Sequence, residues 1–262
     1  QKLKDNYLVQ NKIKEIKELI LACSGMWIEA VSDDYYYTKN DSIKIKFGII
    51  NRNNIAMQLQ NISFPFDTSS DSIINLNIKE NEFYNLNFTK LIPKSLNYSQ
   101  PYWLENEHFL LQKDSAFYNI SNISLLRNPV NVYPFNVVCA LSFNQKINNK
   151  ELNKVIDFNI PILFRTVDPV NGEIYKKINI LPKVVINSDD KVNVFSNKER
   201  MINVKLKSMS DSINGKLSVE FYSNTINQWK SVPQSINFKF NKKYDEQTFS
   251  FKIIPPNNFS ES

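Results

Sequence analysis

The chain has 262 residues and a formal net charge of +6 at pH 7, and 42% of its residues are hydrophobic. This composition excludes a disordered polymer, and the length allows one large domain or two medium-sized domains that each bury a core. The single histidine, His108, excludes a site with several imidazole ligands and a catalytic triad built on any other histidine. Because the first residue is Gln1 and not Met, we expect the chain to be part of a longer protein.

Residues 1–25 predict an amphipathic helix. Apolar residues recur at spacings of four and three, with lysines and glutamates around them, and Ser24-Gly25 ends the pattern. The apolar positions are Val9, Ile13, Ile16, Ile20 and Cys23. A basic amphipathic helix is able to lie on a membrane, but this apolar face is narrow, so we expect it to pack against a neighbouring domain. No window of the sequence has the length and apolar character of a transmembrane segment.

From Trp27 onward the apolar period is two, which predicts β-strands. Apolar and polar residues alternate over residues 43–49, and the pattern resumes over residues 55–59 after the turn Asn51-Arg52-Asn53-Asn54. Further strands are predicted around residues 74–78, 83–88, 132–143 and 155–164. We assign residues 26–166 to a first β-sandwich domain.

A turn-rich stretch, Asp168-Pro169-Val170-Asn171-Gly172, indicates a connector over residues 167–183. A second set of alternating strands follows within residues 184–258, and its short strands at close intervals are typical of an immunoglobulin-like or fibronectin-like sandwich. Its apolar positions are Ile202, Val204, Leu206, Leu217, Val219, Phe221, Ile236, Phe238, Phe240, Phe249, Phe251 and Ile253. The predicted fold is therefore all-β, with two sandwich domains of this kind preceded by an α-helix.

Charged residues and cysteines give no sign of a metal or nucleic-acid site. Lysines such as Lys44 and Lys46 alternate with apolar residues, which indicates a solvated strand face, and no arginine-rich stripe or nucleic-acid motif occurs. Cys23 and Cys139 are too far apart for a metal or redox motif. We expect two buried thiols, with a disulfide as the alternative if the parent protein is exported.

His108 follows Glu105 at the Glu-x-x-His spacing of carboxylate metal sites on helices. Here the surrounding sequence is typical of a loop or strand, and no second Glu-x-x-His completes such a site. We therefore expect a surface or hydrogen-bonded histidine, and no metal ligands or catalytic residues in this chain.

Five aromatic residues are candidates for a sugar-stacking platform: Tyr35, Tyr36, Tyr102, Trp103 and Trp229. Tyr35 and Tyr36 follow the acidic pair Asp33-Asp34. Successive residues of a strand point to opposite faces, so neighbouring tyrosines do not all share a surface. Pro101 favours an extended residue before it and thereby presents the next two rings at a rigid turn or strand start. Each ring either fills a core or forms an exposed platform.

Arg165 and Asp168 flank the predicted junction between the two domains. An arginine–carboxylate pair there would fix the angle between the sandwiches, and an anion site is the alternative.

Three segments of the sequence stand out together: Cys23-Ser24-Gly25-Met26-Trp27-Ile28-Glu29-Ala30, Tyr98-Ser99-Gln100-Pro101-Tyr102-Trp103-Leu104, and the stretch from Phe164 through Asp168-Pro169-Val170-Asn171-Gly172-Glu173 to Leu181-Pro182. In this order and spacing they resemble the long C-terminal extension of LmbE-like (PIG-L family) deacetylases of Bacteroidetes. The resemblance covers about residues 10 to 190, and the last sandwich matches only in type.

In that family an N-terminal Rossmann-like domain removes N-acetyl groups from N-acetylglucosamine-type substrates with a divalent metal, usually zinc. The metal-binding motif is absent from this chain, so the resemblance implies zinc only in a preceding catalytic domain and no cofactor here. It also implies that this catalytic domain is the partner of the helix, and that the protein is located in the periplasm or at the cell surface.

Two functions follow as hypotheses. The first is a non-catalytic accessory region that extends, orients or stabilises a deacetylase-like catalytic domain in the same polypeptide. The alternative is a carbohydrate-binding module for cell-surface or polysaccharide glycans, which would use the aromatic residues above.

Overall fold

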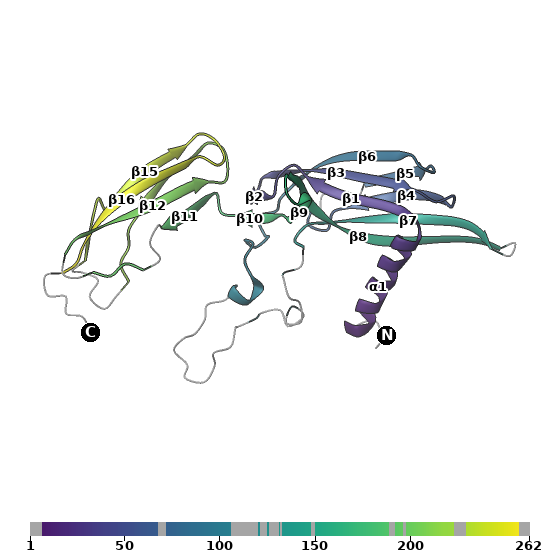
Figure 1. Cartoon of the computed structure of the whole chain (residues 1–262), viewed down its shortest axis with the longest axis horizontal. Coiled ribbons are helices and arrows are strands. Elements are labelled where there is room, and N and C mark those ends of the chain that lie inside the picture. Colours follow the sequence, from purple (N-terminus) through teal and green to yellow (C-terminus); the bar gives the residue numbers. More distant parts are fainter. Residues whose placement is uncertain are drawn as a thin grey trace. The chain divides into compact units, whose positions relative to one another are not determined.

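The computed structural model consists mostly of β-strands, with one α-helix at the N-terminal side (Figure 1). The predicted all-β class is thus confirmed. The structure describes residues 7–67, 72–105, 120, 125, 131, 133–147, 150–188, 192–195, 198–222 and 229–256. It divides into a first unit, residues 1–35 and 39–179, and a second unit, residues 36–38 and 180–262.

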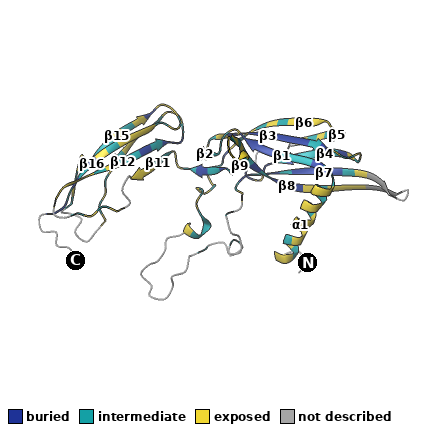
Figure 2. Ribbon diagram, in the orientation of Figure 1, coloured by how far each residue is buried: buried dark blue, intermediate teal, exposed yellow. Residues whose placement is uncertain are grey.

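The predicted helix is confirmed as α1 (Tyr7–Cys23). It ends where Ser24 N donates to the Ile20 carbonyl at 2.9 Å and Gly25 takes a left-handed φ of 66°. None of its residues is buried, and most of the helix is coloured as exposed in Figure 2. The Lys17 ammonium ties it to the sheet by donating to the Asp157 carbonyl at 2.9 Å.

The first unit is built on an eight-stranded sheet with the order β5-β4-β7-β8-β1-β3-β6, in which β9 also pairs with β8. The long strand β8 pairs with β7 over residues 150–161 and with β1 and β9 beyond them. A short 3-10 turn, η1 (Tyr102–Leu104), lies between β6 and β7 in the sequence. The strands are β1 (Met26–Ser32), β3 (Ser42–Asn51), β4 (Ala56–Ser63), β5 (Ser72–Ile78), β6 (Phe83–Leu91), β7 (Asn136–Ile147), β8 (Lys150–Asp168) and β9 (Gly172–Lys177).

Strand alternation builds the core of the first unit. Ile43, Ile45, Phe47 and Ile49 on β3 are fully buried, while Lys44 and Lys46 between them are exposed, as the sequence predicts. Inward residues of the other strands complete the core and appear dark blue in Figure 2. They are Met57, Leu59, Ile62, Val137, Cys139, Leu141, Phe158, Ile160 and Ile162.

Residues 167–183, expected as a connector, instead contribute strands. Asp168 ends β8, and Gly172 begins β9 directly opposite it, so the predicted turn closes a hairpin within the first unit. The Asp168 carboxylate accepts from Val170 N at 2.9 Å and Asn171 N at 2.8 Å, which satisfies the turn backbone. β10 (Asn179–Leu181) then leads into the second unit.

The second unit contains a four-stranded sheet, β11-β12-β16-β14, and a two-stranded sheet, β13-β15. Its buried apolar residues include Leu206, Met209, Phe240, Phe251 and Ile253. The strands are β11 (Val184–Ser188), β12 (Arg200–Ser208), β13 (Ile213–Ser218), β14 (Lys230–Val232), β15 (Ser235–Phe240) and β16 (Glu246–Ile254). Val219 and Phe221, expected to continue one strand with Leu217, lie beyond the end of β13.

The second unit is discontinuous in sequence, which the contiguous assignment of residues 184–258 did not foresee. β2 (Tyr36–Thr38) belongs to it and pairs with β10. Tyr37 and Thr38 are 4% and 1% exposed, and the Lys243 ammonium donates to the Tyr36 carbonyl at 2.7 Å. Among the described residues, no helix has the length and apolar character needed to cross a membrane.

Candidate functional site

The five predicted platform residues are all half-buried, so none is a fully enclosed core ring. Tyr35 packs against Phe164 with ring centroids 5.1 Å apart, and the Lys176 ammonium lies 5.0 Å from its ring. Tyr36, the next residue, lies in β2 and belongs to the second unit. The two adjacent tyrosines therefore belong to different units.

Tyr102 and Trp103 form an edge-to-face pair on η1, with ring centroids 5.0 Å apart. Asn131 holds the chain just before them: its amide oxygen accepts from Tyr102 N at 3.0 Å, and its amide nitrogen donates to the Gln100 carbonyl at 2.7 Å. The predicted rigid turn after Pro101 is therefore present, and its two rings pack on each other.

Trp229 lies in a pocket of the second unit with a volume of about 610 Å³. Its ring centroid is 6.0 Å from that of Phe221, at an interplanar angle of 31°, and 5.1 Å from that of Phe195 in an edge-to-face arrangement. Tyr222 also lines the pocket and is 85% exposed. Several aromatic side chains thus gather in one hollow of a size typical of small-ligand sites.

Polar groups surround these rings. The Tyr222 hydroxyl donates to the Glu220 carboxylate at 2.7 Å, and this hydrogen bond raises the pKa of Tyr222. Lys230 and Gln234 line the same pocket, and Gln234 also accepts from Val219 N through its carbonyl at 3.2 Å. The pocket therefore combines aromatic faces with a carboxylate, an ammonium and an amide.

Of the residues that line this pocket, the sequence analysis identified only Trp229 as a candidate binding residue. Phe221 was assigned to a buried strand face, and Tyr222 and Glu220 were not considered. The signal that would have found them is long-range: Val219 N donates to the Gln234 carbonyl directly beyond the pairing of Ser218 with Ser235, and this pairing of β13 with β15 has no local sequence signature.

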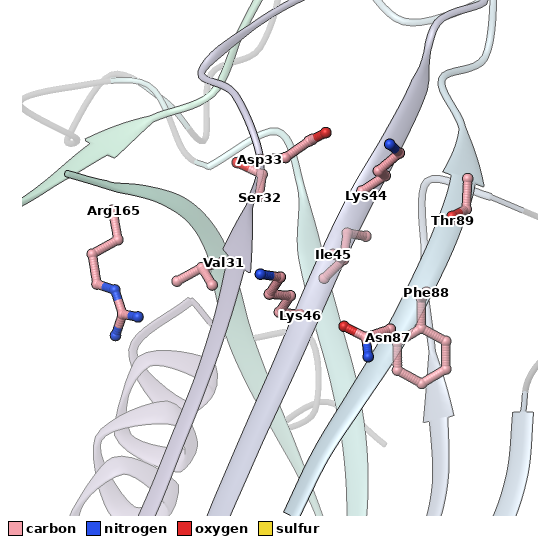
Figure 3. A pocket seen from close by; sticks show the side chains of 10 residues that line it. All are labelled: Val31, Ser32, Asp33, Lys44, Ile45, Lys46, Asn87, Phe88, Thr89 and Arg165. Atoms are coloured by element: carbon pink, nitrogen blue, oxygen red, sulfur yellow. The ribbon is translucent and has the colours of Figure 1, made fainter.

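A second hollow, of about 470 Å³, lies on the outward face of β1, β3, β6 and β8 in the first unit (Figure 3). Lys44 and Lys46 project from β3, and Asn87 and Thr89 lie opposite them on β6. Asp33 and Arg165 complete its charged lining. Two ammonium groups beside an amide and a hydroxyl are able to hold an anionic group, but Asp33 and the acidic partners of Arg165 offset much of this charge.

Arg165 belongs to an ion-pair network within the first unit. Its guanidinium lies 2.9 Å from a Glu29 carboxylate oxygen and 3.3 Å from one of Glu173. The Tyr175 hydroxyl donates to Glu29 at 3.2 Å, and hydrogen bonding with Tyr175, together with the charge of Glu29, raises the pKa of Arg165. The described partners of Arg165 and Asp168 thus come from the first unit, and a role of either residue between domains stays a prediction.

The two thiols occupy different environments. Cys139 is fully buried in β7, and burial raises its pKa to about 12, so its thiol stays protonated. Cys23 is exposed at the end of α1, which corrects the expectation that both thiols are buried. Both are free, so the alternative of a disulfide is also wrong.

No group of three or more metal-ligating side chains occurs within the described residues, and His108 with its predicted hydrogen bonds lies outside them. Comparison with known protein families finds no family that matches the sequence, and comparison with curated proteins finds no match.

Proposed function

We propose that this chain is a non-catalytic accessory region of a larger LmbE-like, N-acetylglucosamine deacetylase-type protein. The observation that supports this proposal is the position of the three sequence blocks that carry the resemblance. Each block contains a turn of the first unit, and residues of each block make contacts that build the fold. Such positions suit a supporting region better than a catalytic centre.

The first block, residues 23–30, contains the joint between α1 and β1, where Gly25 takes its left-handed conformation. The second block contains the turn at residues 100–103 that Asn131 holds on both sides. The third contains the β8–β9 turn, where the Asp168 carboxylate satisfies two backbone amides. These residues of the blocks thus have physical roles in the fold.

We also propose that each unit is an immunoglobulin-like or fibronectin-like sandwich. In the first unit β8 pairs on one side with β7, which continues to β4 and β5, and on the other side with β1, which continues to β3 and β6. A strand that passes from one layer of a sandwich to the other has neighbours of this kind. In the second unit each of the two sheets contributes buried residues, such as Leu206 on β12 and Phe240 on β15, as the two layers of a sandwich do.

The helix α1 supplies the surface through which this region would contact the preceding catalytic domain. Leu8, Ile13, Ile16 and Leu19 are between 41% and 66% exposed, although an amphipathic helix normally buries its apolar stripe. Burying these side chains against a neighbouring domain would stabilise the contact by about 25 cal/mol per Å² of apolar surface. The zinc of such a protein would be bound by that domain, and no residue of this chain is assigned to it.

The proposal is tested first by activity. The purified 262-residue chain, supplied with Zn²⁺ and N-acetylglucosamine oligosaccharides, is expected to release no acetate above the buffer control. Zinc-dependent release of acetate by this chain alone would overturn the accessory role.

The docking face of α1 is tested by replacing Ile16 and Leu19 with glutamine, which preserves helix propensity. In the isolated chain the double variant is expected to keep its melting temperature, because these side chains are exposed. In the longer polypeptide the same change is expected to lower the melting temperature by several degrees. Lys14→Gln, on the polar side of the helix, is the matched control and should be silent in both. A double variant that destabilises the isolated chain as strongly as the longer polypeptide would contradict this docking.

A further inference from the structure

The pocket around Trp229 combines the kinds of side chain that bind carbohydrates. An inference from this pocket does not depend on the proposed accessory role. A pyranose ring is amphipathic: its C–H face packs on flat aromatic rings, and its hydroxyl groups project around the edge toward hydrogen-bonding side chains. The pocket offers both kinds of contact within about 610 Å³.

The two aromatic side chains, Trp229 and Tyr222, are held in place in different ways. Trp229 is held in place by Phe195 and Phe221, at centroid distances of 5.1 Å and 6.0 Å. Tyr222 is 85% exposed and is oriented by its hydrogen bond to Glu220. An exposed ring held in one orientation is a stacking surface that loses little conformational entropy on binding.

The polar contacts match hydroxyl groups, which both donate and accept. Glu220 accepts a hydrogen bond from Tyr222 at 2.7 Å, and a carboxylate with two oxygens has the capacity to accept several. The Lys230 ammonium supplies donors, and the Gln234 side-chain amide supplies a donor and an acceptor. The Glu220 carboxylate beside the rings disfavours a polyanion such as single-stranded nucleic acid, which would otherwise stack on the same aromatics.

We propose that the second unit binds a pyranose residue of a neutral oligosaccharide in this pocket. Trp229 and Tyr222 would provide the stacking faces, and Glu220, Lys230 and Gln234 would bind the hydroxyl groups. Of the five aromatic residues singled out from the sequence, this site uses Trp229 alone.

The test is calorimetric titration of the full chain with hexasaccharides of glucose, mannose, galactose and N-acetylglucosamine. At least one is expected to bind, and Tyr222→Ala is expected to weaken that binding at least tenfold. Because Tyr222 is so exposed, its removal leaves the fold intact, whereas Trp229→Ala also removes packing against Phe195 and Phe221. Trp103→Ala, a change in the first unit, is the matched control and should keep the wild-type affinity.

A second readout locates the site. The chain has three tryptophans, so replacing Trp27 and Trp103 with phenylalanine leaves Trp229 as the only indole. Its fluorescence is expected to change on titration with the hexasaccharide that binds, and Glu220→Gln should weaken the response without shifting the unliganded spectrum. No binding at millimolar concentrations, or binding that survives Tyr222→Ala and fails in Trp103→Ala, would overturn the proposal. Either result leaves the acetate-release test of the accessory role unaffected.

Discussion

At Gly215 the absence of a side chain is required by an aromatic neighbour. Gly215 pairs directly with Phe238 across β13 and β15, and a β-carbon at Gly215 would lie 2.6 Å from the tip of that ring. A phenylalanine ring that covers a strand glycine protects a backbone which would otherwise be exposed. The ring lies in turn beside Phe240, with centroids 5.6 Å apart, so moving it disturbs a buried residue.

Gly215→Ala is therefore expected to destabilise the second unit by about 1 kcal/mol, because the Phe238 ring must move away. Urea unfolding followed by circular dichroism measures the change. In a Phe238→Leu background the cost should be smaller, and Asn214→Ala, on an exposed neighbouring residue, serves as the control. Equal stability of Gly215→Ala and the wild type would contradict this account.

Glu246 is held by two lysines, with its carboxylate 2.9 Å from the Lys207 ammonium and in contact with that of Lys205. Hydrogen bonds from Lys205 and Lys207 lower its pKa to about 2 in the folded chain. Because the folded pKa is below the unfolded value of about 4.3, the contribution to stability is present at neutral pH and is lost as pH falls toward 2.

Glu246→Gln is expected to lower the melting temperature of the second unit at pH 7, and this difference should shrink between about pH 4.5 and pH 2. The contribution is small because the carboxylate is accessible to water. Glu199, for which the described residues give one ion pair, with Lys252, offers Glu199→Gln as the comparison at pH 7, where a smaller loss is expected. A difference between Glu246→Gln and the wild type that is constant across this pH range would show that charge does not cause it.

At the scale of elements, the turn of the β8–β9 hairpin depends on the Asp168 side chain. The Asp168 carboxylate accepts from Val170 N, Asn171 N and the Asn171 amide nitrogen, and the two backbone hydrogen bonds lower its pKa. The folded turn therefore favours the ionised carboxylate, and its stabilising effect is lost as pH falls below the ordinary range of aspartate.

Asp168→Ala is expected to reduce the stability of the first unit, as loss of a capping side chain does. Hydrogen exchange of the β9 amides should accelerate in this variant, with the second unit unchanged. Asp168→Asn retains an acceptor oxygen and should lose less. Faster exchange in the second unit rather than in β9 would instead support the inter-domain role predicted from the sequence.

At the scale of the whole molecule, β2 makes the second unit depend on a residue far from it in sequence. Tyr37 is 4% exposed, and the Lys243 ammonium lies 5.3 Å from its ring centroid. Truncating a buried aromatic side chain removes its packing and leaves a cavity.

Tyr37→Ala is expected to destabilise the second unit by about 3 kcal/mol and to leave the first unit unchanged. Hydrogen exchange resolved by peptide is the measurement, because it reports each unit separately. Tyr35→Ala provides the contrast, since Tyr35 packs on Phe164 and should affect only the first unit. Loss of protection in β3 or β7 of Tyr37→Ala, with β12 and β16 protected, would refute the assignment of β2.

Local patterns predicted the strands well and the connections poorly. The alternation around Phe47 and Phe251 identifies β3 and β16, because strand burial has a period of two that is visible in the sequence. The turn at residues 168–172 has the same composition whether it closes a hairpin or links two domains, so it was assigned to a connector. The pairing of β2 with β10 is long-range and has no local signal.

The pocket around Trp229 shows the same difference between local and long-range signals. Trp229 is easily noticed as a tryptophan, but the residues that line the pocket with it, Tyr222 and Glu220, lie beyond the end of β13, and no local pattern links them to it. Conversely, Tyr102 and Trp103 stand in a conspicuous block and pack on each other. Composition and spacing alone do not distinguish a ring that supports a turn from one that lines a hollow.

The chain passes between the two units three times, at residues 35/36, 38/39 and 179/180. In evolutionary terms, no single recombination point separates them: a crossover within residues 39–179 would combine β2 from one parent with β10 and the rest of the second unit from another. Pairing between β2 and β10 would then be retained only if both parents had compatible strands. The two units are therefore expected to be inherited and to diversify as one block, and an engineer who exchanges the second unit must exchange Tyr36, Tyr37 and Thr38 with it.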